Sequence, residues 1–201
     1  MIDLVLASSS PRRADLLRQI NLSFRVVTPE VSEAWEPGED ATDYVTRLAA
    51  HKAEAVRDSL EDNPVIIGAD TVVVLDNRIL GKPVDMEDAV TMLMNLSGRR
   101  HSVITGVSLV QGTSTWTGST ETIVTFRDLT IEECRRYWET GEPRDKAGAY
   151  GIQGLGAIFV ASIEGSYSNV VGLPLAETAH GLLQFGIDCL DEKNLNRKDG
   201  K

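Results

Sequence analysis

The chain has 201 residues, of which 42% are hydrophobic and 25% are charged, a composition typical of a globular protein with a buried core. Its formal net charge of -10 argues against a protein that coats nucleic acid or binds anionic membranes, because either needs a basic surface. No signal peptide is expected at residues 1–13, and the apolar run around Val72–Leu75 is far too short to span a membrane. Cys134 and Cys189 lack metal-ligand spacing and predict free thiols in a reducing cytoplasm.

Apolar runs alternate with helical patterns along the chain and predict the order of its secondary structure. In chain order we expect a strand at Leu4–Ala7, helices at Pro11–Ile20 and Thr42–Ser59, a strand at Val65–Leu75, a helix at Met86–Leu96, strands at Ser102–Val110 and Glu121–Phe126, a helix at Ile131–Glu139, a strand at Ile158–Ile163 and a helix at Pro174–Phe185. This alternation indicates an α/β fold with a mixed, mostly buried sheet. One domain is expected over residues 1–190, followed by a polar tail at 191–201.

The first candidate site is the segment SSSPRR at residues 8–13, between the first strand and the first helix. Ser10 is a suitable N-cap and Pro11 is favoured at the first helical position, so Arg12 and Arg13 lie in the first turn. Two cations there oppose the helix dipole, so neither arginine is expected to stabilise the fold. The pattern is typical of an anion site built from backbone N–H groups, serine hydroxyls and guanidinium groups. The alternative is a pair of solvated arginines that bond surface carboxylates.

The second candidate is Asp70, which lies with Gly68 and Thr71 inside the apolar strand Val65–Leu75. A buried, ionised carboxylate is costly unless it is paired or holds a metal. We therefore expect Asp70 near the carboxyl edge of the sheet, where open α/β sheets bind ligands. Gly68 would keep the approach uncrowded, and Thr71 would supply a hydroxyl. The alternative is an aspartate that caps the backbone of an adjacent loop.

Other polar residues are informative only in combination. Lys52 lies on the apolar side of its helix, so its ammonium either turns inward to a buried partner or reaches the solvent. Lys82, before a proline in a loop, and Glu33, after a short loop, carry no information alone. The segment DKAGAYGIQG at residues 145–154 is either a glycine-rich hairpin turn or a backbone that approaches a flat ligand, with Gln153 contacting a base edge.

Several sequence blocks occur in order over residues 3–186: LASSSPRR, YVTRLAAHKA, GADTVV, LGKP, LSGRRHSVITGV, DKAGAYGIQG and NVVGLPL. With these blocks the chain resembles the Maf family of nucleotide pyrophosphatases, and DKAGAYGIQG is similar to the branch that hydrolyses dTTP and UTP. The resemblance implies an α/β fold shared with inosine triphosphate pyrophosphatases. In that fold an elongated mixed sheet is flanked by helices, and two lobes surround a nucleotide cleft.

The resemblance also implies an activity, in which a nucleoside triphosphate is hydrolysed between its α and β phosphates to the monophosphate and pyrophosphate. A divalent cation (Mg²⁺ or Mn²⁺), a cytoplasmic location, a homodimer and a housecleaning role linked to arrest of septum formation are implied with it. Asp70 matches the catalytic carboxylate, described as the proton acceptor. The other matched positions are Arg12, Thr71 and Gln153 for substrate choice, Ser8, Arg13, Lys52 and Lys82 for the phosphates, and Glu33 with Asp70 for the metal. The loop at Val31-Ser32-Glu33 departs from the family pattern, which is often more acidic there.

Two other functions stay open at this point. A regulator of septum formation would bind a nucleotide without hydrolysing it, but a pure binder has no need of Asp70, whose carboxylate repels phosphates unless a metal intervenes. A purine-specific pyrophosphatase of similar fold is disfavoured by the DKAGAYGIQG block. Neither alternative has a nucleic-acid polymer or a membrane as its partner.

Overall fold

The computed structural model of the chain describes residues 3–191, so the expected polar tail lies outside the described residues except for Asp191. A seven-stranded sheet runs in the order β2-β1-β3-β5-β6-β7, and β4 pairs with β3. The strands are β1 (Leu4–Ala7), β2 (Arg25–Val27), β3 (Val65–Leu75), β4 (Arg78–Leu80), β5 (Arg100–Gln111), β6 (Ser114–Phe126) and β7 (Val160–Glu164). β1 is parallel to β2 and β3, whereas the β3–β4 and β6–β7 pairs are antiparallel. The expected mixed sheet is therefore confirmed.

The described residues form two compact units, in agreement with the expected two lobes. Among the described residues, the first unit contains residues 3–70, the segment Gly106–Ser119 and residues 172–191. The second unit contains Thr71–Thr105 and Thr120–Val171. β3, β5 and β6 contribute residues to both units.

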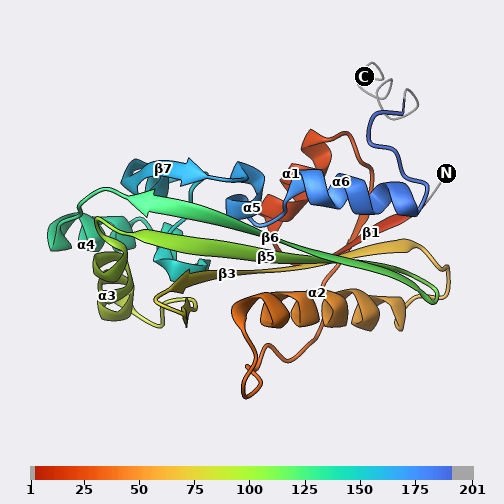
Figure 1. Cartoon of the computed structure of the whole chain (residues 1–201), viewed down its shortest axis with the longest axis horizontal. Helices are drawn as coiled ribbons and strands as arrows, with labels where there is room; N and C mark the ends of the chain where they lie inside the picture. Colours follow the sequence, from red (N-terminus) through yellow and green to blue (C-terminus); the bar gives the residue numbers. More distant parts are fainter. Residues whose placement is uncertain (1–2, 192–201) are drawn as a thin grey trace. The chain divides into compact units, whose positions relative to one another are not determined.

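Three helices belong to the first unit: α1 (Pro11–Gln19), α2 (Ala41–Arg57) and α6 (Leu175–Gln184). In this unit α2 covers one face of the strands, and α1 and α6 cover the other (Figure 1). The N-cap of α2 is Asp40, whose carboxylate accepts a hydrogen bond from the backbone N–H of Asp43. Its buried face consists of Val45, Leu48, Ala49, Lys52, Ala53 and Val56. One lysine is therefore buried with the apolar residues that hold the helix on the sheet.

Two glycines let α2 approach the sheet closely. A Cβ atom at Gly68 of β3 would overlap the carbonyl oxygen of Ala49, and one at Gly106 of β5 would overlap the carbonyl oxygen of Val45. Gly68 thus serves the packing of α2 on β3. This contact accounts for the glycine in place of the expected role of leaving room for a ligand. Because Lys52 lies on the same buried face as Ala49, the close packing also brings Lys52 towards β3.

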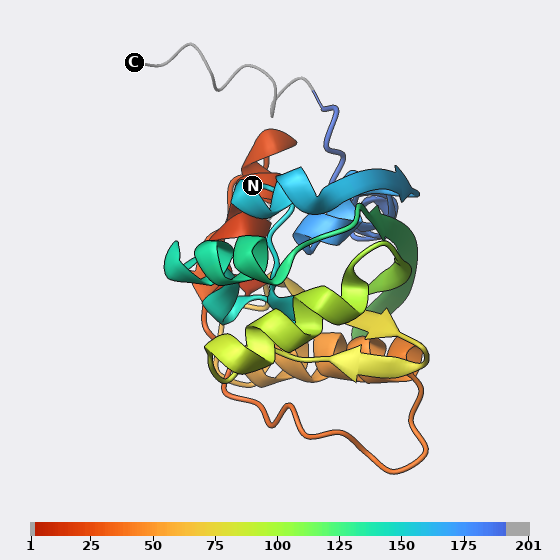
Figure 2. The ribbon, with the colours of Figure 1, turned by 90° about the vertical axis from the view of Figure 1, so that its left-hand side faces the viewer.

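The second unit contains α3 (Met86–Leu96), α4 (Ile131–Glu139) and the short α5 (Tyr167–Val171). α3 packs against α4 (Figure 2), and α4 begins with a reciprocal capping box between Thr130 and Glu133. Three 3-10 turns, η1 (Glu142–Asp145), η2 (Ala147–Ala149) and η3 (Leu155–Phe159), connect α4 to β7. The glycine-rich segment is therefore not a hairpin turn, and that interpretation was wrong.

Most expected elements begin and end within two residues of the observed boundaries, and the exceptions have local causes. β6 begins at Ser114 instead of Glu121, because its polar first half lacks an apolar pattern and forms by pairing with β5. β2, β4 and α5 were not predicted, since three to five residues are too few for a periodic signal. Cys134 and Cys189 are both free thiols, as expected. Among the helices of residues 3–191, none is both long and apolar enough to cross a membrane.

Candidate active site

Asp70 lies in the middle of β3, inside the apolar strand as the sequence indicates. Its neighbour β1 is shorter and ends at Ala7, which pairs with Gly68, so Asp70 lies two residues beyond the carboxyl end of β1. The polar edge of the sheet is therefore made by the end of β1, while β3 continues past it. The Asp70 side chain is only 12% exposed, and an ionised carboxylate in this position needs a partner.

Lys52 is that partner. Its Nζ atom lies 2.6 Å from Oδ1 of Asp70 and 2.6 Å from Oε1 of Glu33, and its side chain is 9% exposed. The inward orientation of Lys52 is confirmed, and the solvent-directed alternative was wrong. The interpretation of Asp70 as a loop cap is replaced by this ion pair. One buried ammonium therefore joins two carboxylates from different parts of the first unit.

The start of α1 supplies cations to the same unit. Ser10 is the N-cap and Pro11 is in the first turn, as expected, but the Ser10 hydroxyl makes no capping bond. The Ser8 hydroxyl instead accepts from the Ser10 backbone N–H at 3.1 Å and from Nη1 of Arg13 at 3.3 Å. Nε of Arg13 donates to the carbonyl of Gly172 at 2.8 Å. Arg13 is thus tied to the fold, unlike an arginine that serves an anion alone.

The charged side chains around the start of α1 influence the pKa of Arg13. Burial lowers the pKa of the Arg13 guanidinium below its usual value. The carboxylates of Asp70 and Glu33 oppose that shift, and the cation of Arg12 adds to it. The structure therefore gathers six of the predicted residues in the first unit: Ser8, Arg12, Arg13, Glu33, Lys52 and Asp70.

The remaining predicted residues belong to the second unit. Thr71 follows Asp70 directly, and its hydroxyl oxygen lies 2.9 Å from that of Thr105. Lys82 is exposed in the loop between β4 and α3. Gln153 is exposed in the turn that precedes η3. Lys82 and Gln153 are thus accessible to a solute.

The segment that carries Gln153 is organised by a carboxylate that the sequence did not single out. Glu142 accepts hydrogen bonds from the Tyr137 hydroxyl at 2.7 Å and from the backbone N–H groups of Leu155 at 2.8 Å and Gly156 at 3.0 Å. A Cβ atom at Gly154 would overlap the Glu142 carboxylate, and one at Gly156 would overlap the Tyr137 hydroxyl. These two glycines are therefore explained by contacts within the protein rather than by a flat ligand.

The carboxylates of the cluster determine whether a divalent cation could bind in the first unit. Glu33 and Asp70 already direct one carboxylate oxygen each to a single cation, the Lys52 ammonium. No cluster of three or more His, Cys, Asp or Glu side chains that could hold a metal occurs within residues 3–191. Mg²⁺ is commonly held by one or two carboxylates together with substrate phosphates and water. Glu33 and Asp70 could therefore contribute to such a site only together with ligands from outside the protein.

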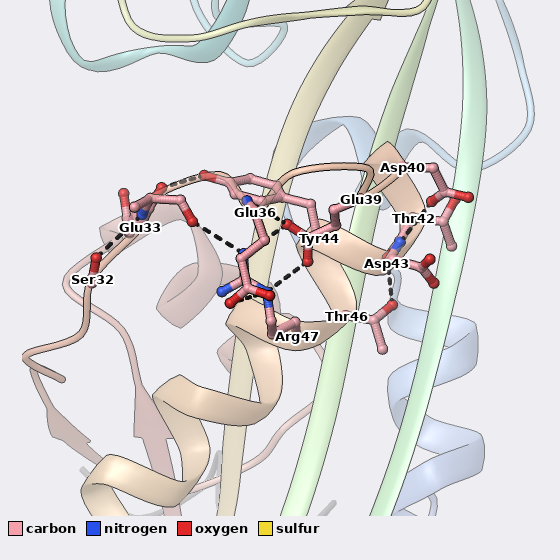
Figure 3. A network of polar contacts seen from close by, with 11 residues as sticks. Ser32, Glu33, Glu36, Glu39, Asp40, Thr42, Asp43, Tyr44, Thr46 and Arg47 are labelled. Atoms are coloured by element: carbon pink, nitrogen blue, oxygen red, sulfur yellow. Dashed lines mark hydrogen bonds and ion pairs between the residues drawn. The ribbon is translucent and has the colours of Figure 1, made fainter.

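Two further residues near the site were missed from the sequence. Tyr44 and Arg47 project from the first turns of α2 to the loop that carries Glu33 (Figure 3). They occur three residues apart in the block YVTRLAAHKA, on the part of the helix that an apolar pattern does not mark. Only their contacts with the loop distinguish them from ordinary surface residues.

The fold and this cluster define a mixed α/β protein with a charged site at the carboxyl end of a parallel strand. The family model described as Maf-like protein matches residues 3–185, and the chain belongs to this family. The chain is similar to proteins named dTTP/UTP pyrophosphatase from several bacteria. In Vibrio parahaemolyticus the identity is 50% over 184 residues, which cover 92% of this chain and 97% of the relative. In Symbiobacterium thermophilum it is 51% over 186 residues, which cover 92% and 95%.

The solved structures that the chain matches are more distant in sequence. The Staphylococcus aureus Ham1 protein has a TM-score of 0.44 and 19% identity, with 63% of this chain and 72% of that chain covered. A nucleoside-triphosphatase (dITP/XTP pyrophosphatase) from Mycobacterium abscessus has a TM-score of 0.43 and 15% identity, with 92% and 98% covered.

Proposed function

We propose that this chain is a nucleoside triphosphate pyrophosphatase that hydrolyses dTTP and UTP to the monophosphate and pyrophosphate. The observation that carries the proposal is the cluster of Lys52 with Glu33 and Asp70, in the same unit as the two arginines at the start of α1. Cations of this kind neutralise a polyphosphate, and paired carboxylates can share a metal with it. The printed names of relatives at about 50% identity over 92% of the chain support the same activity.

In this proposal the phosphates are bound by Ser8, Arg13, Lys52 and Lys82. Arg13 would contribute the charge of a guanidinium that is held in place by its bonds to the Gly172 carbonyl and the Ser8 hydroxyl. The backbone N–H groups at the start of α1 add partial positive charge without any side chain. Lys52 would exchange part of its contact with the carboxylates for a phosphate oxygen once a substrate arrives.

Asp70 is the proposed catalytic residue. Asp70 and Glu33 would together hold a divalent cation, Mg²⁺ or Mn²⁺. When bound, such a cation neutralises phosphate charge and makes water more acidic. Asp70 would accept the proton of the attacking water at a carboxylate oxygen, and its buried position keeps that oxygen fixed.

Substrate choice is assigned to Arg12, Thr71 and Gln153. Uracil and thymine both present an O4 acceptor and an N3–H donor, which one primary amide can match with its N–H and its carbonyl. Gln153 is exposed in a turn, so its amide is available for that contact. Cytosine reverses the donor and acceptor pattern and would leave polar groups unpaired.

The same proposal extends to the location, the partners and the cellular role of the protein. The activity would reside in one domain over residues 1–190 of a cytoplasmic homodimer. Its partners would be nucleotides rather than nucleic-acid polymers or membranes. It would remove non-canonical pyrimidine nucleotides, a housecleaning role linked to arrest of cell division.

The decisive experiment compares the wild-type protein with Asp70→Asn on a panel of nucleoside triphosphates with Mg²⁺ or Mn²⁺, scored for pyrophosphate release. We expect release from dTTP and UTP, and a loss on the order of 10²-fold or more in the variant, because an amide neither accepts the proton nor holds the metal comparably. The exposed Asp62→Asn in the same unit is the matched control and should keep full activity. Nucleotide binding without pyrophosphate release, or an active Asp70→Asn variant, would overturn the proposal.

A further inference from the structure

The loop at residues 28–40 carries Glu33 to the candidate site, yet little apolar packing holds it. It joins β2 to α2 without regular secondary structure and runs beside α2 (Figures 1 and 2). Residues 32–38 are all exposed. The lining of a hollow of about 470 Å³ includes Val31, Ser32 and Ala34 of the loop and His51 and Ala55 of α2. Burial therefore does not determine where Glu33 lies.

Polar contacts with the first turns of α2 take the place of that packing (Figure 3). The Tyr44 hydroxyl donates to the backbone carbonyl of Glu33 at 2.9 Å. Arg47 donates from Nη2 to the carbonyl of Ala34 at 3.1 Å. Arg47 also forms a two-pronged ion pair with Glu39, with Nε–Oε1 and Nη2–Oε2 distances of 2.6 and 2.7 Å. The loop is thus fastened to one helix at Glu33, at Ala34 and again at Glu39.

This pair of anchors has the geometry of a rigid contact. The Arg47 and Glu39 side chains are only 18% and 8% exposed, and a two-pronged bond between arginine and carboxylate fixes both distance and orientation. The Trp35 ring stacks on the Tyr44 ring at a centroid distance of 4.9 Å, and the Arg47 guanidinium lies 5.6 Å from the centroid of Tyr44. Arg47, Tyr44 and Trp35 therefore support one another, and the loop cannot shift at Glu33 without breaking several contacts.

We propose that Tyr44 and Arg47 are positioning residues that clamp the Glu33 loop onto α2 and so keep the Glu33 carboxylate at the Lys52–Asp70 pair. α2 supplies both the clamp and Lys52, so one helix sets the distance between the loop carboxylate and the strand carboxylate. The hydrogen bonds of the clamp run to backbone carbonyls of the loop, so its proposed effect on the site passes through the position of Glu33. This inference rests on the proposed pyrophosphatase function, and it adds the residues that assemble its site.

The test uses the full chain and two variants that remove different parts of the clamp. Tyr44→Phe deletes only the hydroxyl that bonds the Glu33 carbonyl and keeps the ring under Trp35. Arg47→Met keeps the length of the side chain and deletes both ion-pair and carbonyl contacts. Arg57→Met is the matched control, because Arg57 lies at the other end of α2 and pairs with Asp58 outside the loop.

Two readouts are expected to move together. Amide hydrogen exchange, measured without metal or nucleotide, should accelerate in residues 30–39 of both clamp variants and stay unchanged in residues 45–57 and in Arg57→Met. The Mg²⁺ concentration for half-maximal dTTP hydrolysis should rise about three- to tenfold in Tyr44→Phe, the size of one lost hydrogen bond, while kcat at saturating Mg²⁺ changes little. A merely structural role would lower the melting temperature without shifting the Mg²⁺ dependence.

A double variant separates the clamp from other effects. In a Glu33→Gln background, Tyr44→Phe should cause almost no further rise in the Mg²⁺ requirement, because its effect passes through Glu33. Unchanged exchange in residues 30–39, or an undiminished additional effect in the double variant, would overturn the clamp. A wild-type protein that releases no pyrophosphate would overturn the proposed function instead, and the exchange measurement would still decide whether the clamp exists.

Discussion

Lys52 shows how a single residue determines the character of the site. A buried ammonium is costly when alone, and Lys52 is stabilised by two carboxylates at 2.6 Å. Asp70 in turn depends on Lys52, because its own position in β3 is also buried. The three side chains therefore form one electrostatic group, and a change in any of them alters the environment of the other two.

At the same scale, the two arginines of α1 should differ in their effect on stability. Arg13→Ala removes hydrogen bonds to the Gly172 carbonyl and the Ser8 hydroxyl, and we expect a loss of about 1–3 kcal/mol in the free energy of unfolding. Arg12→Ala removes a cation that the helix dipole disfavours, so it should lower the free energy of unfolding less than Arg13→Ala does. Both substitutions should lower kcat/KM for dTTP, and each loss should correspond to about 2–4 kcal/mol of activation free energy.

Urea unfolding without nucleotide, together with steady-state kinetics, checks both expectations. If Arg13→Ala proved as stable as the wild type, its bonds to Gly172 and Ser8 would contribute little. If both variants kept full activity, the anion site at the start of α1 would be excluded.

At the scale of the elements, the approach of α2 to β3 brings the site together. The helix can touch the strand at Gly68 because no side chain intervenes, and Ala49 and Ala53 keep the contact surface small. Lys52 lies between these two alanines in the sequence, and its ammonium reaches Asp70 two residues along β3. Packing and site geometry therefore have one common cause.

Gly68→Ala should separate the helix from the strand. The added methyl group meets backbone atoms of Ala49 that cannot rotate away, so we expect about 1–3 kcal/mol of destabilisation and a larger relative loss of dTTP hydrolysis. Gly81→Ala is the control for stability, because a Cβ atom there meets nothing within 4 Å. Chemical denaturation and activity of the two variants check the prediction, and equal stability would show that α2 does not need this close contact.

The segment between α4 and β7 is the second element with a testable role. If Gln153 contacts the base, Gln153→Ala should reduce the ratio of dTTP to dCTP hydrolysis more than it reduces the overall rate. The preference of the wild type for dTTP over dCTP should correspond to roughly 1–3 kcal/mol, which is the cost of leaving polar groups of cytosine unpaired. kcat/KM for both nucleotides checks this, with the exposed Gln184→Ala as the control. An unchanged ratio would leave substrate choice to Arg12, Thr71 or the backbone.

Across the whole molecule, the net charge of -10 does not prevent binding of a polyanion. Charges more than about 8 Å apart are largely screened at physiological salt, so the cations nearest a phosphate outweigh distant carboxylates. Arg12, Arg13 and Lys52 all belong to the first unit, where they act on the same region. An acidic protein can therefore carry a local site for a triphosphate.

The stability of the whole chain should depend on pH through His101. The residue is 3% exposed, Nε2 lies 2.9 Å from the Tyr150 hydroxyl, and Nδ1 has no hydrogen-bond partner in the part of the chain that is described. Burial lowers the pKa of His101 from 6.5 to about 4. Between these values the unfolded chain binds a proton that the folded chain does not, so stability falls as the pH decreases through this window.

The contribution of His101 between pH 7 and pH 5 should be about 2 kcal/mol. His101→Gln cannot titrate, so its free energy of unfolding should decrease less over that interval than that of the wild type. Urea denaturation of both proteins at the two pH values checks this. The same decrease in both proteins would mean that other groups cause the acid sensitivity.

The local pattern of the sequence was enough to predict most elements and most charged residues of the site. The continuous apolar run predicted β3 with its observed bounds, because a strand that is covered on both faces has no polar alternation. The Ser10-Pro11 pair located the start of α1, because its capping preferences act within a few residues. The roles proposed for Asp70 and Gln153, by contrast, came from the family resemblance and remain predictions.

Properties that depend on residues far apart in the chain were decided only by the tertiary structure. The sequence left open whether Lys52 turns inward, and its position between Glu33 and Asp70 results from the packing of α2 on Gly68. Arg13 acquired a structural bond to Gly172, which lies 159 residues away and was not associated with it in the sequence. Tyr44 and Arg47 became significant only through the loop they hold. Short-range preferences determine elements, whereas contacts between distant residues determine which charges meet.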